Sequence, residues 1–484
     1  MGLKIVKIPV GMILMVKKIT FSPVTRLSGL LSVEIVVDRG KIVNARTRGT
    51  MFRGYEWIMR GRKVTDAVYM TQRICGICSL AHGAVGSYLL DELYGNIISE
   101  NAQYLRNIMF AADFLQNHIR HFYFFGLPDF VKMPEKPPFL GQDLNDLRLN
   151  REDNRRLVDN YYKAVKAAQE SHQLLALFGG KIPNQHSFVH GGVTVAPTAD
   201  KINQAKALIE SIQQFVQGCM IPDTELISRA YRDYFQIGVT PLRLISFGLF
   251  PFGPQNDDYL WPPGVIINNE FELPQVEFIE EQVPYSYYEA NDEGENVFNQ
   301  YPEPAPFKPE AYSYIKTVLY KGQHFETGPY ARGVIRGDYR GRASTMDRIV
   351  ARSLEALKLA GFIREWLTRL EPGPPPLNQN EEPVKDRAVA TTGAMRGALL
   401  HSAIIEGEEV KSYNVITPTT WNFSPRDKNG NPGPVERALI GTEIPGGAML
   451  ETIVGRIIRS FDPCISCGTH VYSIDGKLQK KIEF

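Results

Sequence analysis

Four of the five cysteines in this 484-residue chain form two Cys-x-x-Cys pairs near opposite ends of the sequence. The first pair is Cys75 and Cys78, and the second is Cys464 and Cys467. Both sulfurs of such a pair can converge on one metal ion, and thiolates select soft metals of the zinc, iron–sulfur or nickel class. The pairs lie too far apart for a zinc finger or ribbon, in which about 12–20 residues separate them. The spacing therefore favours a buried four-thiolate metal centre, with a redox dithiol or a coincidence as the alternatives.

The cysteine count and the charge balance exclude several classes of protein. Five cysteines in so long a chain cannot form a disulfide framework, and Cys219, beside Met220, is predicted to be a small buried hydrophobic residue. The chain has 54 basic and 53 acidic side chains, so neither nucleic acid nor an anionic membrane is expected as its main partner. A hydrophobic content of 43% is typical of a globular protein.

The elements that position the cysteines are predicted to be mostly helical. The alternation of Val33, Ile35 and Val37 before a turn at 38–40 predicts an N-terminal β-hairpin. Residues 241–309 are rich in proline, glycine and aromatic residues, which indicates irregular β structure and long loops. We expect a mainly α (α+β) fold with a large multi-helical core. Apolar residues at helical spacing predict helices over 79–93, 101–125, 153–177, 199–215, 223–234, 345–370 and 447–459.

The two ends of the chain are predicted to lie outside a single large domain over residues 21–470. Residues 1–20 are interpreted as a leader or an over-extended start, with Met15 as an alternative initiator. Their apolar stretch, Ile5 to Val16, is shorter than the roughly 20 residues that cross a bilayer, and no signal-peptidase site follows it. Residues 471–484 are predicted to form a C-terminal extension.

The residues around the two cysteine pairs resemble the paired signatures of the large, catalytic subunit of [NiFe] hydrogenases. The first signature is Arg73-x-Cys75-Gly76-x-Cys78-x-x-x-His82, and the second is Asp462-Pro463-Cys464-x-x-Cys467-x-x-His470. The resemblance runs from about Phe21 to His470, in the order that the family has. Its other blocks are Phe52–Glu56, Gly328–Arg332, Arg396–Leu399, Pro418–Asn422 and Ser424–Asp427.

The resemblance implies an enzyme that splits H2 reversibly into protons and electrons. Cys75 and Cys464 would be terminal nickel ligands, and Cys78 and Cys467 would bridge nickel and iron. The iron would carry cyanide and carbon monoxide ligands. Cys464 would also accept a proton when H2 is cleaved heterolytically.

The resemblance also assigns roles to residues around the centre. His82, one helical turn after Cys78, would donate a hydrogen bond to the Cys78 sulfur. Arg396 would overhang the open face, contact one cyanide and assist proton removal. Thr419 would donate its hydroxyl to the other cyanide. Without the resemblance, His82 would be interpreted as a core histidine, Arg396 as a surface residue and Thr419 as a turn residue.

The resemblance also implies a second metal site. Glu56, His470 and the backbone carbonyl of Val415 would bind magnesium. Carboxylate and carbonyl oxygens suit such a hard cation, whereas a histidine ligand is less typical. Iron or another divalent ion is therefore the alternative.

The remaining predictions concern partners and location. Once four of the five thiols bind the centre, the chain has no cysteines for a cluster, so electrons must leave through an iron–sulfur small subunit. The family implies a maturation protease that removes residues 471–484 after nickel insertion, so this chain would be an unprocessed precursor. The Pro418–Asn422 block resembles the membrane-associated uptake group. We therefore expect a membrane-anchor subunit and a location at the outer face of the membrane, with the cytoplasm as the alternative.

Two departures from the family pattern bear on proton transfer. Where the family has Arg-Ile-Glu-Gly-His, this chain has Arg26-Leu27-Ser28-Gly29-Leu30, and Ser28 can pass a proton but cannot hold one as a carboxylate does. Where the family has His-Asp-His, this chain has Gln116-Asn117-His118, which removes a negative charge near Arg396. Two other functions stay open: a non-catalytic hydrogen sensor of the same fold, and a metal-free quinone-chamber subunit like that of complex I. The quinone-chamber subunit lacks the cysteine pairs.

Overall fold

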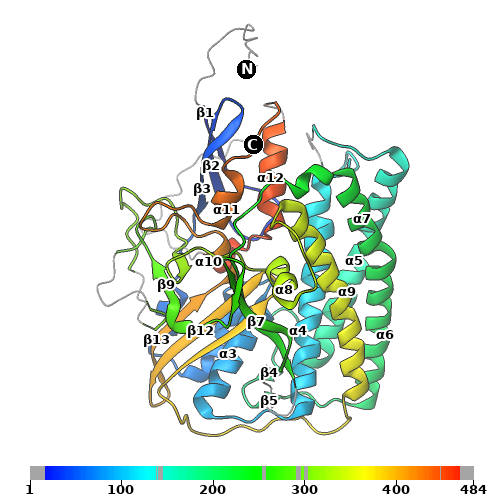
Figure 1. The fold of residues 1–484 in the computed structure, drawn as a ribbon. Coiled ribbons are helices and arrows are strands. Elements are labelled where there is room, and N and C mark those ends of the chain that lie inside the picture. The colour runs from blue at the N-terminus through cyan, green and yellow to red at the C-terminus, as the bar shows by residue number, and fades with distance from the viewer. Residues whose placement is uncertain are drawn as a thin grey trace.

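Long helices form a bundle along one side of the molecule (Figure 1). The computed structural model describes residues 17–137, 139, 145–252, 258–289, 296–298, 303–446 and 449–468. In the bundle α4 packs against α5 and α9, and α6 packs against the same two helices. Their bounds are α4 (Glu100–Arg120), α5 (Arg151–Gly179), α6 (Ala199–Phe215), α7 (Ile221–Ala230) and α9 (Thr345–Arg369).

The bundle helices begin at polar caps that the sequence supplies. The side chains of Ser99, Asn150 and Thr198 each accept a hydrogen bond from the third backbone N–H of their helix. Ser344 and Asp347 form a reciprocal capping box at the start of α9. The predicted helices are confirmed, with shifts of a few residues at their ends. The largest shift is in α4, which ends at Arg120 and continues as a π-helical turn, His121–Gly126.

The N-terminal hairpin is confirmed and has a third strand. The antiparallel sheet has the order β1 (Lys17–Phe21), β2 (Leu31–Asp38) and β3 (Lys41–Gly49). Ile19 of β1 pairs with Ile35 of β2, and both side chains belong to an apolar cluster that also includes residues of α12 (Leu450–Ser460). The sheet therefore begins at Lys17, before the predicted domain start at residue 21.

A second three-stranded sheet, which the sequence analysis did not predict, covers residues 387–416. Its strands are β11 (Arg387–Ala394), β12 (Gly397–Glu406) and β13 (Glu409–Ile416). Ala394 pairs with Gly397, so Met395 and Arg396 form a two-residue turn between β11 and β12. α3 (Ser79–Tyr94) packs against both of these strands. The sheet thus brings Arg396 toward the helix that follows the first cysteine pair.

The middle of the chain has the irregular β structure that its composition predicts. Short strands pair in sequence order there, and loops connect them. The strands are β6 (Leu244–Phe252), β7 (Asp258–Ile267), β8 (Glu270–Glu272), β9 (Ile279–Gln282) and β10 (Thr317–Tyr320), and two short strands, β4 (Phe188–Val189) and β5 (Gly192–Val193), pair before them.

Short helices complete the fold, and several carry the sequence blocks named above. Cys219 lies in a π-helical turn, Val216–Met220, beside two exposed residues, and it is partly exposed. The prediction of a buried Cys219 was therefore wrong. The short helices are α1 (Tyr55–Met59), α2 (Ala67–Met70), α8 (Pro329–Arg336), α10 (Pro418–Asn422), α11 (Pro434–Leu439), α12 (Leu450–Ser460) and α13 (Ile465–Gly468).

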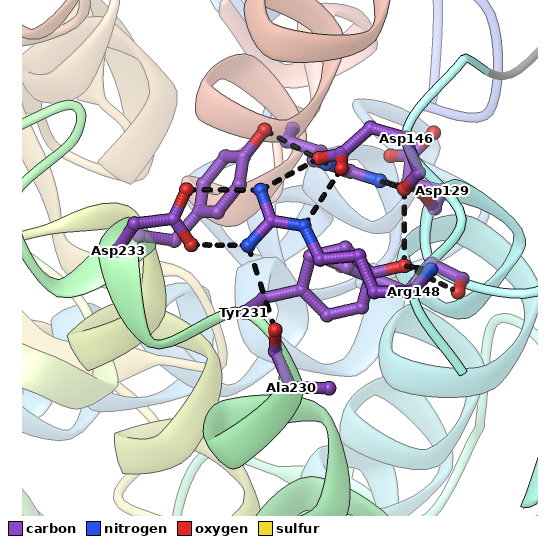
Figure 2. Close-up of polar contacts among 9 residues, drawn as sticks. Asp129, Asp146, Arg148, Ala230, Tyr231 and Asp233 are labelled. Carbon is purple, nitrogen blue, oxygen red and sulfur yellow. Dashed lines mark hydrogen bonds and ion pairs between the residues drawn. The ribbon is translucent and has the colours of Figure 1, made fainter. Parts of the chain in front are cut away.

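Two arginines hold α12, which leads into the second cysteine pair. Arg459 donates to both carboxylate oxygens of Asp129, at 2.6 and 2.8 Å. Arg456 donates to the Asp129 carbonyl through Nε at 3.1 Å and to Asp146 Oδ2 at 2.6 Å. Figure 2 shows that Arg148 lies between Asp146 and Asp233 and donates to both carboxylates. The largely buried ion pairs of Arg456 with Asp146 and of Arg459 with Asp129 fix the start of the segment that contains Cys464.

No helix in the part of the chain that the structure describes is long and apolar enough to cross a membrane.

Candidate metal centre

Three cysteines from the two ends of the chain meet in the interior. The sulfurs of Cys75, Cys78 and Cys464 all lie within 4.8 Å of one another, and Cys75 Sγ is 3.2 Å from Cys464 Sγ. All three side chains are buried. The predicted convergence of the two pairs is therefore confirmed for these three residues. The side chain of Cys467, and all of His470, lie outside the described residues.

The N-terminal segment closes over the second cysteine pair. Ser28 forms a parallel bridge with Cys464, and the backbone N–H of Ile465 donates to the Ser28 carbonyl at 2.7 Å. The Ser28 hydroxyl donates to Ser466 Oγ at 3.3 Å. Gly29 has a φ of +88°, and a Cβ there would lie 2.6 Å from the Ser466 nitrogen, so this close approach requires glycine.

The Phe52–Glu56 block holds the loop that contains the first pair. Arg53 donates to the carbonyls of Ile74, at 2.6 Å, and Arg73, at 2.8 Å. Its guanidinium also donates to the Tyr55 hydroxyl at 2.8 Å. Arg53 therefore fixes the two residues immediately before Cys75. The resemblance in this block thus has a structural basis, because the block positions a candidate ligand.

Arg396 lies at the site as a buried cation. Its Nε is 3.1 Å from Asp462 Oδ1, yet none of its three guanidinium nitrogens makes a hydrogen bond to a described residue. Burial opposes its charge, but Asp462 and the three cysteines together raise the pKa of Arg396 well above its ordinary value. Arg396 is therefore cationic, with donors available to a bound group.

Asp462 connects Arg396 to the helix bundle. Its Oδ2 accepts a hydrogen bond from the Asn117 amide at 3.0 Å and lies 3.2 Å from Arg352 Nη1. Although burial acts to raise it, the arginines and His121 hold the pKa of Asp462 well below its ordinary value. Asn117 is thus a neutral donor to Asp462, and Asp462 keeps the negative charge beside Arg396.

The turn that carries Arg396 is itself held by Arg332, the last residue of the Gly328–Arg332 block. Arg332 Nη1 donates to the Ala394 carbonyl at 2.9 Å, and Nε and Nη2 donate to Glu355 at 2.8 and 2.7 Å. His118 Nε2 lies 2.8 Å from Glu355 Oε1. Arg332 was identified from the sequence only as part of a family block, and Glu355 was not identified. Contacts between a hairpin turn and two helices leave no spacing pattern in a sequence.

Packing against Thr327 also fixes the turn at Arg396. Gly397 has a φ of +138°, and a Cβ there would lie 2.3 Å from Thr327 Cγ2. The backbone N–H of Ala398 donates to Thr327 Oγ1 at 2.7 Å. In the Arg-Gly-Ala sequence at 396–398, Arg396 therefore supplies the functional side chain. Glycine at position 397 is the only residue type that permits the close contact with Thr327.

Thr419 and His82 are both placed beside the cysteines. The backbone N–H of Cys464 donates to Thr419 Oγ1 at 3.2 Å, which leaves the hydroxyl hydrogen of Thr419 for another acceptor. His82 Nδ1 lies 3.2 Å from His401 Nε2, and His401 Nδ1 lies 2.8 Å from the Tyr413 hydroxyl. Burial lowers the pKa of His401 well below its ordinary value. The hydrogen bond expected from His82 to Cys78 stays a prediction.

Glu56 and Val415 lie in a second buried polar cluster. Glu56 Oε2 has no hydrogen-bond partner among the described residues, and its Oε1 is 4.0 Å from Lys316 Nζ. Lys316 is also 3.1 Å from Glu281 Oε1, and Asn414 donates to the other oxygen of Glu281 at 2.6 Å. The backbone N–H of Val415 donates to Asn414 Oδ1 at 2.9 Å. Glu281, Lys316 and Asn414 were missed by the sequence analysis, because they lie in or next to strands that are distant in sequence.

The donor set at the cysteines fits a soft metal with anionic ligands. Three buried sulfurs that approach this closely repel one another as thiolates unless cations lie between them. The guanidinium nitrogens of Arg396, which make no hydrogen bond to a described residue, face the same group of charges and would be satisfied by an anionic ligand on a metal. At Glu56 the unpaired carboxylate oxygen fits a hard cation.

A family model described as nickel-dependent hydrogenase matches residues 53–136 and 127–470 of this chain. The chain is 34% identical to the periplasmic [NiFeSe] hydrogenase large subunit of Desulfomicrobium baculatum, over 94% of this chain and 95% of that protein. It is 28% identical to the hydrogenase-1 large chain of Escherichia coli K12, over 95% and 96% of the two chains. The family-model match spans both cysteine pairs and all the blocks between them.

Solved structures show the same fold. The chain superposes on the Ni-Fe-Se hydrogenase from D. vulgaris Hildenborough in the reduced state with a TM-score of 0.90 and 34% identity. That match covers 94% of this chain and 100% of the other. The mainly α (α+β) fold class predicted from the sequence is therefore confirmed.

Proposed function

This chain belongs to the nickel-dependent hydrogenase family, and from that premise we propose that it is the catalytic large subunit of a hydrogenase that splits H2 reversibly into protons and electrons. The observation that carries the proposal is the meeting of Cys75, Cys78 and Cys464 within 4.8 Å in the interior. The comparisons support this function and neither alternative, the hydrogen sensor or the quinone-chamber subunit.

We propose that Cys75, Cys78, Cys464 and Cys467 hold a nickel–iron centre with cyanide and carbon monoxide on the iron. When bound, this centre supplies the redox chemistry and the Lewis acidity that heterolysis of H2 requires. Cys464 is proposed to accept one product proton. Its backbone is held by Ser28 and Thr419, which keeps its sulfur in place while its charge changes.

The residues around the cysteines are proposed to bind and orient the diatomic ligands. Arg396 donates to one cyanide, which would satisfy nitrogens that otherwise make no hydrogen bond to a described residue. Thr419 donates to the other cyanide through its remaining hydroxyl hydrogen, since its oxygen already accepts from Cys464. His82 donates to the Cys78 sulfur, and its ring orientation is supported by the contact with His401.

We propose magnesium, or another divalent ion, at Glu56, the Val415 carbonyl and His470. The support is the buried Glu56 carboxylate, which has one oxygen without a hydrogen-bond partner among the described residues. Glu281 adds a second negative charge nearby, and Lys316 balances part of it. Because His470 would be a ligand, this ion would tie the end of the mature chain to β13 and α1.

We propose that electrons leave through an iron–sulfur small subunit docked over the first cysteine pair. Arg73 and Gly76 are exposed on either side of the buried Cys75, so the centre lies directly beneath this surface. A short distance between the centre and a partner's cluster would allow direct electron transfer. The relatives are named as large subunits or large chains, which implies a smaller partner in each case.

The processing of the chain and its location are also proposed from its membership of this family. We propose that a maturation protease removes residues 471–484 after nickel insertion, and that residues 21–470, extended at the start by β1, form one domain. The relative from Desulfomicrobium baculatum is named as periplasmic, and we propose a similar location at the outer face of the membrane through an anchor subunit.

Hydrogen-dependent reduction of a viologen dye by the complex purified from its native host tests the function. The proposal predicts fast turnover that is lost in Cys464→Ser and kept in Cys219→Ser, which alters a cysteine outside the cluster. Slow turnover with nickel fully present would favour a hydrogen sensor. An absence of turnover with nickel present and residues 471–484 removed would contradict the proposed enzyme.

A further inference from the structure

Asp113 is a buried carboxyl for which the proposed function has no role. It lies on α4, with 3% of its surface exposed. Its Oδ1 accepts a hydrogen bond from Gln116 Nε2 at 2.9 Å, and its Oδ2 has no hydrogen-bond partner among the described residues. No ion pair within 4 Å compensates this carboxyl in the described part of the chain. Burial of this kind disfavours the ionised form of a carboxyl group.

The face of α4 that carries Asp113 contacts both cysteine loops. Gln116, one turn further along, donates to the Ile77 carbonyl between Cys75 and Cys78 at 3.3 Å. Asn117 donates to Asp462, two residues before Cys464. Asp113 is thus one hydrogen-bonded residue, Gln116, away from the first cysteine loop.

Two hydrogen-bond acceptors on this face of α4 have no donor among the described residues. Gln116 Oε1 and Asp113 Oδ2 are both buried acceptors without a hydrogen-bond partner among the described residues. An ionised carboxylate can only accept, whereas a carboxylic acid has one O–H to donate. Protonation of Asp113 therefore supplies a donor where the local structure has too many acceptors.

Burial and the charges that face Asp113 together place its pKa near neutrality. Burial raises the pKa of Asp113 to about 7, and Cys75 acts in the same direction. The hydrogen bond from Gln116 and the cations Arg120, on α4 itself, and Arg396, at the β11–β12 turn, act in the opposite direction. A change of charge at the cysteines would therefore shift the protonation of Asp113.

The other carboxyls at the site stay ionised. Asp462 is paired with Arg396 and Arg352, and Glu355 accepts two hydrogen bonds from Arg332. The ion pairs hold the pKa of Glu355 at about 2 in spite of its burial. The Ser28 and Ser466 hydroxyls beside Cys464 can pass a proton along but cannot retain one near neutral pH.

We propose that Asp113 holds an exchangeable proton beside the cysteine cluster and takes up and returns one proton in each catalytic cycle. The proposal rests on the proposed function. When H2 is split, one of the two product protons converts the Asp113 carboxylate into the carboxylic acid, and the two electrons leave through the small subunit. Release of that proton to solvent restores the carboxylate.

Infrared spectroscopy of the purified complex tests this proposal directly. A protonated carboxyl has a C=O band apart from the amide bands, and the band shifts in D2O. The test compares wild type, Asp113→Asn and Asp223→Asn. Asp223 is a matched control: it is a buried aspartate whose burial also raises its pKa, but its oxygens accept from Tyr123 at 2.8 Å and Asn160 at 2.9 Å.

We expect a carboxylic acid band near neutral pH that Asp113→Asn removes and Asp223→Asn keeps. Its intensity should change between H2 and an inert gas in the wild type. Asp113→Glu should move the band instead of removing it, and should restore hydrogen–deuterium exchange that Asp113→Asn lowers by about tenfold or more. If Asp113→Asn does not accumulate, the comparison of wild type with Asp113→Glu still identifies the band.

An unchanged carboxyl spectrum in Asp113→Asn or Asp113→Glu, in protein with its full nickel content and normal dye reduction, would overturn the proposal while leaving the hydrogenase function intact. The Asp113 carboxylic acid band could instead be present in protein that has no nickel and no activity. That result would show that Asp113 holds a proton, but the proposed function would fail, and with it the role of Asp113 in turnover.

Discussion

The sulfurs of Cys75 and Cys464 lie 3.2 Å apart, although 389 positions separate the two residues in the sequence. A metal bound there connects the loop before α3 to the segment after α12. Because the two segments belong to opposite ends of the chain, binding free energy at this site is also stabilisation of the whole fold.

We therefore predict that metal loading raises the thermal denaturation temperature, and that the increase is lost in Cys464→Ser. Loaded and unloaded protein are compared by calorimetry, together with their nickel contents. Cys219→Ser serves as the control, because Cys219 lies in the π-helical turn outside the cluster. Equal denaturation temperatures for loaded and unloaded wild type would show that the metal does not link the two segments.

Arg396→Lys should retain nickel and lose activity. A lysine keeps the positive charge next to Asp462 but lacks the planar, multiple donors that a guanidinium presents to anionic ligands. We expect kcat to fall by about 100-fold or more, the loss typical of one electrostatic donor in an active site. The expected signature is a shift of the cyanide stretching bands with unchanged metal content. Wild-type turnover in this variant would remove Arg396 from the mechanism.

Arg332→Gln should destabilise the fold and disorder the turn that carries Arg396. The variant leaves the Glu355 carboxylate buried with His118 as its remaining side-chain partner, and loss of one partner of a buried ion pair costs about 3–5 kcal/mol. The double variant Arg332→Gln with Glu355→Gln should recover part of that loss, because no buried charge is left alone. Denaturant unfolding measures both, and a strictly additive double variant would argue against coupling between the two residues.

Glu436 should make stability fall as the pH rises toward neutrality. Its side chain is fully buried on α11, and its Oε1 accepts from the Thr47 N–H and the Tyr312 hydroxyl, each at 2.9 Å. Burial raises the pKa of Glu436 from 4.5 to about 7. The fold thus binds this proton more tightly than the unfolded chain, so the stabilisation is fully present below about pH 4.5 and is lost as the pH rises through about 7. The difference amounts to about 3 kcal/mol.

Glu436→Gln keeps an acceptor for both donors and removes the titration. Thermal denaturation of wild type and Glu436→Gln across this pH range measures the effect. The variant should show the smaller dependence of its denaturation temperature on pH. Parallel curves for the two proteins would mean that Glu436 is ionised in the fold throughout the range.

The sequence was most informative where a single residue type, or a repeat of apolar residues over several helical turns, indicates the structure. Two Cys-x-x-Cys pairs predicted a shared centre, and three of the four sulfurs do converge. The long helices were found because their apolar residues repeat over several turns. The sheet at 387–416 was not predicted, because small residues such as Ala388, Ala390 and Ala398 give only a weak alternation between buried and exposed positions.

Residues that act through tertiary contacts were harder to find. Arg332 and Glu355 meet because α8 and α9 pack together, and neither spacing nor composition reveals that contact. Asp113 lies on an amphipathic helix, where an acidic position normally faces solvent. It is buried instead, because α5 and α9 cover one side of α4 and the cysteine loops lie against the other.

The proposed nickel–iron centre is tested most directly by the nickel and iron content of the complex purified from its native host, with the end of the chain determined by mass spectrometry. We expect about one nickel per chain, with iron in excess from the partner's clusters, in protein that ends at His470. Absence of nickel with residues 471–484 still attached would identify an immature precursor, on which the measurement is repeated after processing. Absence of nickel in protein that ends at His470 would contradict the proposed four-cysteine nickel–iron centre.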